Sequence, residues 1–321
     1  MRRRAFLDRC LIGSPWLLAG GGSLTALNSS PGFAAASPAP PEAQGLTTYQ
    51  LGPQIWIRWD NRIVTCYRAH PSQKYPYLFP LAGPRSGQSL TSETSLPYPH
   101  HRSCFLACDR VNGGNYWQES LDQGRIVSRG PTIADQTRTA VRIVDDCEWQ
   151  RPDTPVVMKD HRQITVSLAN PRQPVIDWEI AWTAIQEVTV ETTNHSLFAL
   201  RAAADIAPSG GGQLVNAEGR TGEKATFGQP SAWCAFYGRR PDVVPDLIEG
   251  IALLDHPLNP WPRCPWFTRD YGFISPTPFN FRATPWRLEA GESVLLKYRI
   301  VLFAGTPDEA RLADVHRAWI A

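Results

Sequence analysis

The sequence predicts an all-β protein, a large antiparallel β-sandwich with one short C-terminal helix. Two observations predict it. Short runs of β-branched and aromatic residues, bounded by Gly, Pro, Asn and Asp, recur almost to the end of the 321 residues. No helical period of useful length interrupts these runs, so βαβ units and a parallel sheet are not expected.

The longest expected strand, residues 175–192, shows the clearest pattern. Ile176, Trp178 and Ile180 fall on one face, whereas Asp177 and Glu179 fall on the other. The expected strands cover residues 54–59, 62–68, 77–81, 103–108, 125–133, 139–144, 163–168, 175–192, 198–203, 232–237, 248–254, 267–274 and 294–303.

The single helix is expected at the end of the chain. It opens at Pro307, and Leu312, Val315 and Trp319 follow near helical spacing. We take residues 47–321 as one β-sandwich domain, because about a dozen strands follow one another without a linker.

The N-terminus resembles an export signal. Arg3 and Arg4 have the twin-arginine spacing, an apolar stretch follows, and residues 34–36 are three alanines that offer a cleavage site. We expect a signal peptide at residues 1–36 and a flexible linker at residues 37–46, and hence a periplasmic or secreted protein. No apolar stretch of eighteen residues follows, so no membrane span is expected in the mature chain.

Charge and cysteine content narrow the possible partners. Lys and Arg number 32 against 30 Asp and Glu, which leaves no basic footprint for a nucleic acid. Six cysteines follow the signal, and an even number in an exported chain permits disulfides. They lie in apolar runs and are expected to be small core residues. The six are Cys66, Cys104, Cys108, Cys147, Cys234 and Cys264.

Two polar stretches, residues 99–117 and 254–272, concentrate the chemistry of the chain. We expect them to meet across one pocket that binds a small-molecule or oligosaccharide ligand, because an aromatic ring can cover the apolar face of a sugar while polar side chains bind its hydroxyls. The side chains expected to hold the ligand are His100, Arg102, Asn112, Trp117, Arg269 and Tyr271.

Three residues are candidate proton carriers. His101 and His256 belong to the most versatile acid–base residue type, whose pKa ordinarily lies near neutrality. Glu179 is a candidate base if its face lines the concave side of the sandwich, and a solvated carboxylate otherwise. Each stretch also has a structural interpretation, with a histidine that fixes a loop, a tryptophan in the core or an Arg269–Asp270 ion pair.

No cofactor is expected. The chain has no CxxC, HxH or HExxH spacing for zinc, no GxSxG elbow for a serine nucleophile and no phosphate-cradling loop. A divalent metal held by His100 or His101 together with His256 and a carboxylate stays open as an alternative.

The same segments resemble a bacterial family designated DUF6807, which also carries the label "methane oxygenase PmoA". The resemblance runs from about residue 54 to the C-terminus. It rests on residues 75–81, 99–103, 111–113 with Trp117, 216–219 with 232–233, and 255–260 with 269–272. We set the methane label aside, because a membrane monooxygenase subunit needs several spanning helices.

The resemblance implies a galactose-mutarotase-like β-supersandwich, in which histidine and carboxylate side chains on a concave sheet move sugar protons. Two positions depart from the family pattern. Pro97 and Tyr98 stand where Asp and His are expected, and Phe267 stands where His is expected after Trp266. Both departures remove polar groups from the expected pocket.

Three functions follow as hypotheses. The first is a carbohydrate-active enzyme that acts on a sugar or keto-sugar by His and Glu proton transfer. The second is a non-catalytic carbohydrate-binding protein, which the two departures favour. The third is a metal-dependent oxygenase or hydrolase in keeping with the family label.

Overall fold

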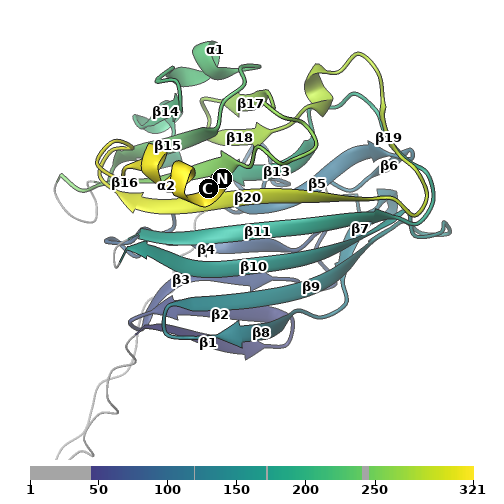
Figure 1. Cartoon of the computed structure of the whole chain (residues 1–321), viewed down its shortest axis with the longest axis horizontal. Coiled ribbons are helices and arrows are strands. Elements are labelled where there is room, and N and C mark those ends of the chain that lie inside the picture. The colour runs from purple at the N-terminus through teal and green to yellow at the C-terminus, as the bar shows by residue number, and fades with distance from the viewer. Residues whose placement is uncertain (1–44, 119, 171–172, 241–245) are drawn as a thin grey trace, which may run out of the picture. The chain divides into compact units, whose positions relative to one another are not determined.

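Two antiparallel sheets lie face to face in the computed structural model of the chain (Figure 1). The structure describes residues 45–118, 120–170, 173–240 and 246–321. The expected signal peptide and all but the last two residues of the expected linker lie outside the described residues. The all-β sandwich predicted from the sequence is confirmed.

The first sheet has eleven strands and includes the first strands of the described chain. Its main path runs in the order β1-β2-β3-β4-β5-β13-β18-β17, with β6, β12 and β19 paired at its side. The strands are β1 (Leu46–Leu51), β2 (Gln54–Trp59), β3 (Arg62–Arg68), β4 (Tyr77–Leu81), β5 (Cys104–Val111), β6 (Gly114–Asn115), β12 (Val188–Val190), β13 (Ser196–Arg201), β17 (Trp266–Arg269), β18 (Phe273–Pro276) and β19 (Trp286–Leu288).

The second sheet has nine strands in the order β14-β15-β16-β20-β11-β10-β9-β7, with β8 paired to β9. Its long central strands are in front in Figure 1. They are β7 (Arg125–Ser128), β8 (Thr132–Gln136), β9 (Ala140–Gln150), β10 (Met158–Asn170), β11 (Gln173–Ala184), β14 (Gln213–Asn216), β15 (Trp233–Arg239), β16 (Ile248–Asp255) and β20 (Ser293–Ala304).

Helices are few in the described part of the chain. The two α-helices are α1 (Gly222–Thr226) and α2 (Leu312–Ile320), and the short 3-10 helices are Leu121–Gln123, Ala204–Ile206, Pro208–Gly210 and Phe279–Phe281. None of the helices among these residues is long and apolar enough to cross a membrane.

Aromatic side chains fill the space between the sheets. Phe198 of β13 stacks on Tyr298 of β20 with ring centroids 4.5 Å apart and packs edge-on against Trp178 of β11 at 5.0 Å. Phe198 therefore faces the second sheet. Its neighbours on β13 alternate, so Ala199 and its cross-strand partner Phe105 face away from the second sheet. We call this side of the first sheet the outer face.

The second sheet has an apolar cluster on its own far side. Trp233, Leu254 and Phe303 pack there with Leu312 of α2. Helix α2 thus covers part of the sheet surface that looks away from the first sheet, as Figure 1 shows. We call this side the helix face.

Each of three expected strands is divided into two strands in the structure. Residues 175–192 divide into β11 and β12, which belong to different sheets. The alternation could not show this break, because the buried positions before the bend (such as Trp182 and Ala184) and after it (Val188 and Val190) are all even-numbered. Residues 125–133 divide into β7 and β8.

Residues 267–274 fold as the hairpin of β17 and β18. Gly272 makes this turn possible, since its φ of 98° lies in the left-handed region, which glycine adopts without strain. The C-terminal helix begins at Leu312, five residues later than expected. Arg311 has a φ of 54°, which no regular helix can continue through.

Candidate functional site

A chain excursion between β4 and β5 brings two histidines onto the outer face. Its two arms pair at Glu93 and Arg102, and Thr91 pairs with Ala202 just after β13. His101 directly precedes Arg102, and its ring stacks on Phe273 of β18 with centroids 4.4 Å apart. The side chain of His101 is consequently buried.

A third histidine, His195, lies directly before β13 and faces the same place. Its ring centroid lies 5.8 Å from that of His100 and 5.8 Å from that of Trp117. His195 Nδ1 donates to Asp109 Oδ2 at 3.3 Å, and the Thr193 hydroxyl donates to the other oxygen of the same carboxylate. With Nδ1 engaged, the neutral imidazole presents Nε2 as a proton acceptor.

Arg201 ends β13 and closes the other side of the site. Its guanidinium carbon lies 4.5 Å from the ring centroid of Tyr271, which in turn stacks at 6.2 Å on His101. Burial raises the pKa of Tyr271 to about 12, so its hydroxyl stays protonated and able to donate. We call His100, His101, Trp117, His195, Arg201 and Tyr271 the outer cluster.

The outer cluster contains several buried polar atoms that have no hydrogen-bond partner. They are Nδ1 of His101, Nε1 of Trp117, and Nε and Nη1 of Arg201. Buried polar groups in folded proteins are almost always paired, because an unpaired group forfeits the hydrogen bonds it made in water. Such atoms on three neighbouring side chains are characteristic of a site that receives a polar ligand.

Electrostatics keep His101 uncharged. Burial, together with the nearby His100, Arg201 and His195, lowers its pKa to about 2. So low a pKa does not favour the role of proton carrier that the sequence suggested for His101. A neutral His101 can still donate or accept a hydrogen bond.

Two of the expected ligand-binding residues, Arg102 and Asn112, have local partners instead. Arg102 bonds the Gln73 side chain and lies 5.8 Å from the centroid of the Tyr77 ring. Asn112 bridges to the backbone of Glu187 and Thr189 and so fixes a turn.

Arg269 lies beside the outer cluster, because it is the cross-strand partner of Phe273, whose ring stacks on His101. Its guanidinium has local partners. The guanidinium carbon lies 4.6 and 4.1 Å from the ring centroids of Phe227 and Phe267, which meet edge to face at 5.4 Å, and the side chain forms an ion pair with Glu223 at 3.1 Å. Phe267, which stands where the family pattern predicts histidine, is thus one of two rings that pack against Arg269.

His256 and Glu179 lie on the helix face rather than at the outer cluster. The His256 ring packs edge-on against Trp319 of α2 at 4.7 Å. Glu179 forms an ion pair with Lys297 of β20 at 3.1 Å. The expectation that residues 99–117 and 254–272 meet across one pocket is therefore wrong for His256. Tyr271 does lie near residues 99–117, with its ring centroid 6.2 Å from that of His101, because the hairpin of β17 and β18 carries it to the first sheet.

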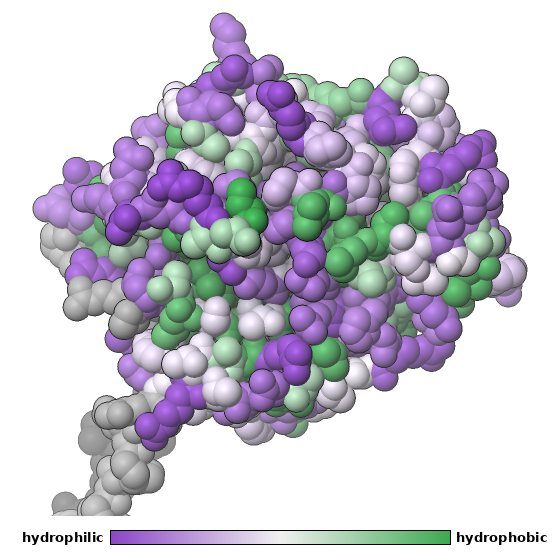
Figure 2. All heavy atoms as spheres, in the orientation of Figure 1, coloured by the Kyte–Doolittle hydropathy of each residue, from purple (hydrophilic) through white to green (hydrophobic). Residues whose placement is uncertain are grey.

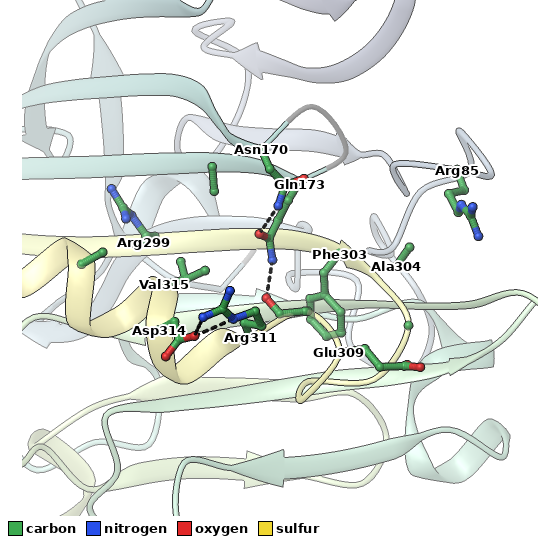
Figure 3. Close-up of a pocket in the computed structure, with 14 residues that line it drawn as sticks. Arg85, Asn170, Gln173, Arg299, Phe303, Ala304, Glu309, Arg311, Asp314 and Val315 are labelled. Atoms are coloured by element: carbon green, nitrogen blue, oxygen red, sulfur yellow. Dashed lines mark hydrogen bonds and ion pairs between the residues drawn. The ribbon is translucent and has the colours of Figure 1, made fainter.

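The helix face also carries a wide groove beside α2 (Figure 3). The groove has a volume of about 810 Å³ and is lined by Gln173, Arg299, Phe303, Arg311 and Asp314 among others. Two of the arginines that line it are engaged, since Arg311 bonds Asp314 and Arg299 bonds Asp177. In the space-filling view of this side, hydrophilic and hydrophobic side chains are interspersed (Figure 2).

Sequence reasoning missed His195, Asp109 and Arg201. One signal was available for Arg201, because it is the sole charged residue in the apolar run 196–204. His195 and Asp109 had no such signal, since they come together only through the pairing of β5 with β13.

In the described ranges, no three or more His, Cys, Asp or Glu side chains are placed to hold a metal ion together. The six cysteines of the described residues are buried free thiols.

The chain belongs to DUF6807, a family of unknown function whose model matches residues 54–317. This confirms the resemblance found in the sequence. No curated protein matches the chain.

Solved structures with some similarity include a galactose mutarotase related enzyme from Lactobacillus acidophilus, at 7% identity and a TM-score of 0.31 over 80% of this chain and 97% of that one. Another is the galactosidase domain of an alpha-galactosidase-sucrose kinase, at 8% identity and a TM-score of 0.36 over 82% of this chain and 41% of that one. A third is a polysaccharide lyase, at 11% identity and a TM-score of 0.32 over 83% of this chain and 34% of that one.

Proposed function

We propose that the outer cluster binds a sugar and that His195 exchanges a proton with it. The observation that carries this proposal is the set of unpaired buried polar atoms on His101, Trp117 and Arg201, all placed among aromatic rings. Sugars present both an apolar ring face and a dense set of hydroxyls, so they need this combination of aromatic surface and convergent polar groups.

The proposed roles follow from the contacts. Trp117 offers its indole N–H to a ligand oxygen, and Tyr271 offers a hydroxyl that stays protonated. His195 is held by Asp109 in the orientation of a general base, with Nε2 as the acceptor. His101 holds the ligand by a hydrogen bond instead of carrying a proton, because its pKa lies far below neutrality.

A binding and turnover assay on a panel of aldoses, keto-sugars and oligosaccharides tests the proposal. We expect His195→Asn to keep the fold and to lose roughly 100-fold or more of any turnover, as removal of a general base does. His161→Asn is the matched control, because His161 also pairs with an aspartate, Asp146 at 2.8 Å, but on the exposed surface of the second sheet. Equal turnover in the two variants would remove His195 from the mechanism.

A second candidate, non-catalytic sugar binding, is favoured by one observation. His101 stays uncharged and positions 98 and 267 carry Tyr and Phe, so the site has fewer titrating groups than the family pattern implies. Binding of a sugar by calorimetry with no product after prolonged incubation would favour this candidate over the enzyme.

We also propose that the chain is exported through the twin-arginine route. The sequence of residues 1–36 supports this, with Arg3 and Arg4 ahead of an apolar stretch and an Ala-rich cleavage site. Replacement of both arginines by lysine is expected to keep the chain in the cytoplasm, which cell fractionation measures. Unchanged export of that variant would contradict the route.

A further inference from the structure

The arginines of this chain differ in whether a carboxylate accompanies them into the interior. Three arginines are at most 6% exposed in the described residues, namely Arg162 at 0%, Arg240 at 4% and Arg201 at 6%. A buried guanidinium costs far more than an exposed one unless an opposite charge is close by, so each of the three needs a counter-charge.

Two of the three have one. Arg162 Nε lies 2.6 Å from Asp160 Oδ1, and Nη2 lies 3.1 Å from Oδ2, which makes a bidentate pair. Arg240 Nε lies 2.9 Å from Asp205 Oδ2, with Glu249 Oε2 at 3.8 Å from its Nη1.

Arg201 has none among the described residues. Its Nε and Nη1 make no hydrogen bond, and its close neighbour is the ring of Tyr271. The hydroxyls of Tyr271 and Tyr98 are the groups that favour its charged form, whereas burial opposes it. The guanidinium is therefore a desolvated cation, placed against an aromatic ring with two donors unused.

We infer that Arg201 holds the carboxylate of an acidic sugar, of the hexuronic acid class, bound in the outer cluster. This inference rests on the proposed function and names its ligand class. A guanidinium binds a carboxylate through two parallel N–H donors, and a carboxylate supplies the single negative charge that Arg201 lacks.

The surroundings favour a carboxylate over a phosphate. Arg201 is the one arginine of the outer cluster, and the adjacent His101 is neutral, so the cluster lacks the second permanent cation that a phosphate dianion attracts. The rings of Tyr271, Phe273 and Trp117 lie beside this histidine and match the apolar face of a pyranose better than a polyanion.

The test compares acids with neutral sugars of the same shape. Calorimetric titration with D-galacturonate against D-galactose, and with D-glucuronate against D-glucose, changes only the group at C6. We expect the wild-type protein to bind one of the acids roughly 10- to 100-fold more tightly than its neutral partner, as a charge-assisted hydrogen bond provides. Arg201→Met is expected to abolish that preference.

Stability supplies a second readout. Removal of an unpaired buried charge leaves no orphan, so Arg201→Met is expected to unfold at the same or a higher urea concentration than the wild type. Arg240→Met, the matched control, strands Asp205 and Glu249 and is expected to unfold at a lower urea concentration. Should Arg201→Met fail to fold, Arg201→Gln gives the same binding comparison.

Each other outcome overturns a stated part. If the wild type binds acid and neutral sugars equally, or if Arg201→Met keeps the preference, the carboxylate inference fails and the proposed sugar site stands. Binding of inorganic phosphate that depends on Arg201, without binding of either acid, overturns the carboxylate assignment. A destabilised Arg201→Met would show that the arginine has an internal role. Failure of every sugar, acidic or neutral, to bind at millimolar concentration overturns both proposals.

Discussion

The helix face of the second sheet and the outer cluster on the first sheet differ in whether their cations have a carboxylate partner. On the helix face, Lys297 pairs with Glu179 at 3.1 Å and Arg299 pairs with Asp177 through two bonds of 2.6 and 2.8 Å. On the outer face, Arg201 is buried without a carboxylate, and His101 is buried with an unpaired ring nitrogen.

This difference distinguishes charges that are paired within the protein from a buried charge that has no partner in the described chain. The pairs on the helix face satisfy themselves and are partly exposed, so they contribute little beyond local order. The outer cluster is the opposite case, because its buried polar atoms cost free energy that nothing else in the described chain offsets. Proteins keep such costs mainly where a function requires them.

The largest expected effect on stability comes from removing the carboxylate partner of a buried arginine, which leaves it unpaired like Arg201. Asp160→Ala leaves the guanidinium of Arg162 buried and uncompensated. We expect it to lower the free energy of unfolding by about 3–5 kcal/mol, measured by urea denaturation. Asp146→Ala removes an exposed partner of His161 and is expected to cost less than about 1 kcal/mol. Similar losses in both variants would show that burial does not set the value of these pairs.

A buried acid on the second sheet predicts that stability falls as pH rises from about 4 to about 7. Burial raises the pKa of Asp255 from 3.8 to about 7, although a hydrogen bond from Asn259 opposes this. The proton is therefore held more tightly in the folded state, so the stabilisation is complete below pH 3.8 and is lost as pH rises through 7.

Asp255→Asn keeps the acceptor oxygen and removes the titration. Relative to the wild type, we expect this variant to gain about 2–4 kcal/mol between pH 5 and pH 9, since each pKa unit corresponds to about 1.4 kcal/mol. Urea midpoints at the two pH values give the difference. Parallel pH profiles for the two proteins would contradict a raised pKa.

The buried His101 on the outer face should make stability depend on pH in the opposite direction. Its pKa is lowered from 6.5 to about 2, so the stabilisation is complete above pH 6.5 and is lost as pH falls below it. We expect the wild type to lose about 1.4 kcal/mol for each pH unit below 6 relative to His101→Gln. Urea denaturation at pH 6.5 and pH 5 measures this, and the two proteins should diverge only at the lower value.

The smallest effect is expected at Glu179. Its pair with Lys297 is partly exposed, so Glu179→Gln should change the free energy of unfolding by less than about 1 kcal/mol. It should leave sugar binding unchanged, because Glu179 lies on the helix face. A loss of binding in this variant, measured by calorimetry, would return Glu179 to the list of site residues.

The sequence specified local structure well and long-range placement less well. Three strands, β2, β3 and β4, have the predicted bounds, since turn residues such as Gly52 and Asn61 bracket each apolar run. The packing of the whole sheet decides which face of a strand lies against the core. Alternation alone therefore could not tell whether Glu179 lines a concave site or the helix face.

The candidate site was half predicted for the same reason. His100, His101 and Trp117 lie within one short stretch, so their proximity is local. His256 follows β16, whose outward side chains pack under α2, and no pattern in the sequence reveals that helix position. His195 and Arg201 reach the site through strand pairing that joins residues about a hundred positions apart.

The most direct test of the account uses the seven histidines as reporters. With ring-¹⁵N histidine labelling, NMR spectra can be recorded during titration with whichever sugar or sugar acid binds best. The account predicts that the signals of His100, His101 and His195 shift with a common dissociation constant, while those of His256 and His316 stay in place. Shifts at His256 and His316 with no change at the other three would place the ligand on the helix face and contradict the central claim.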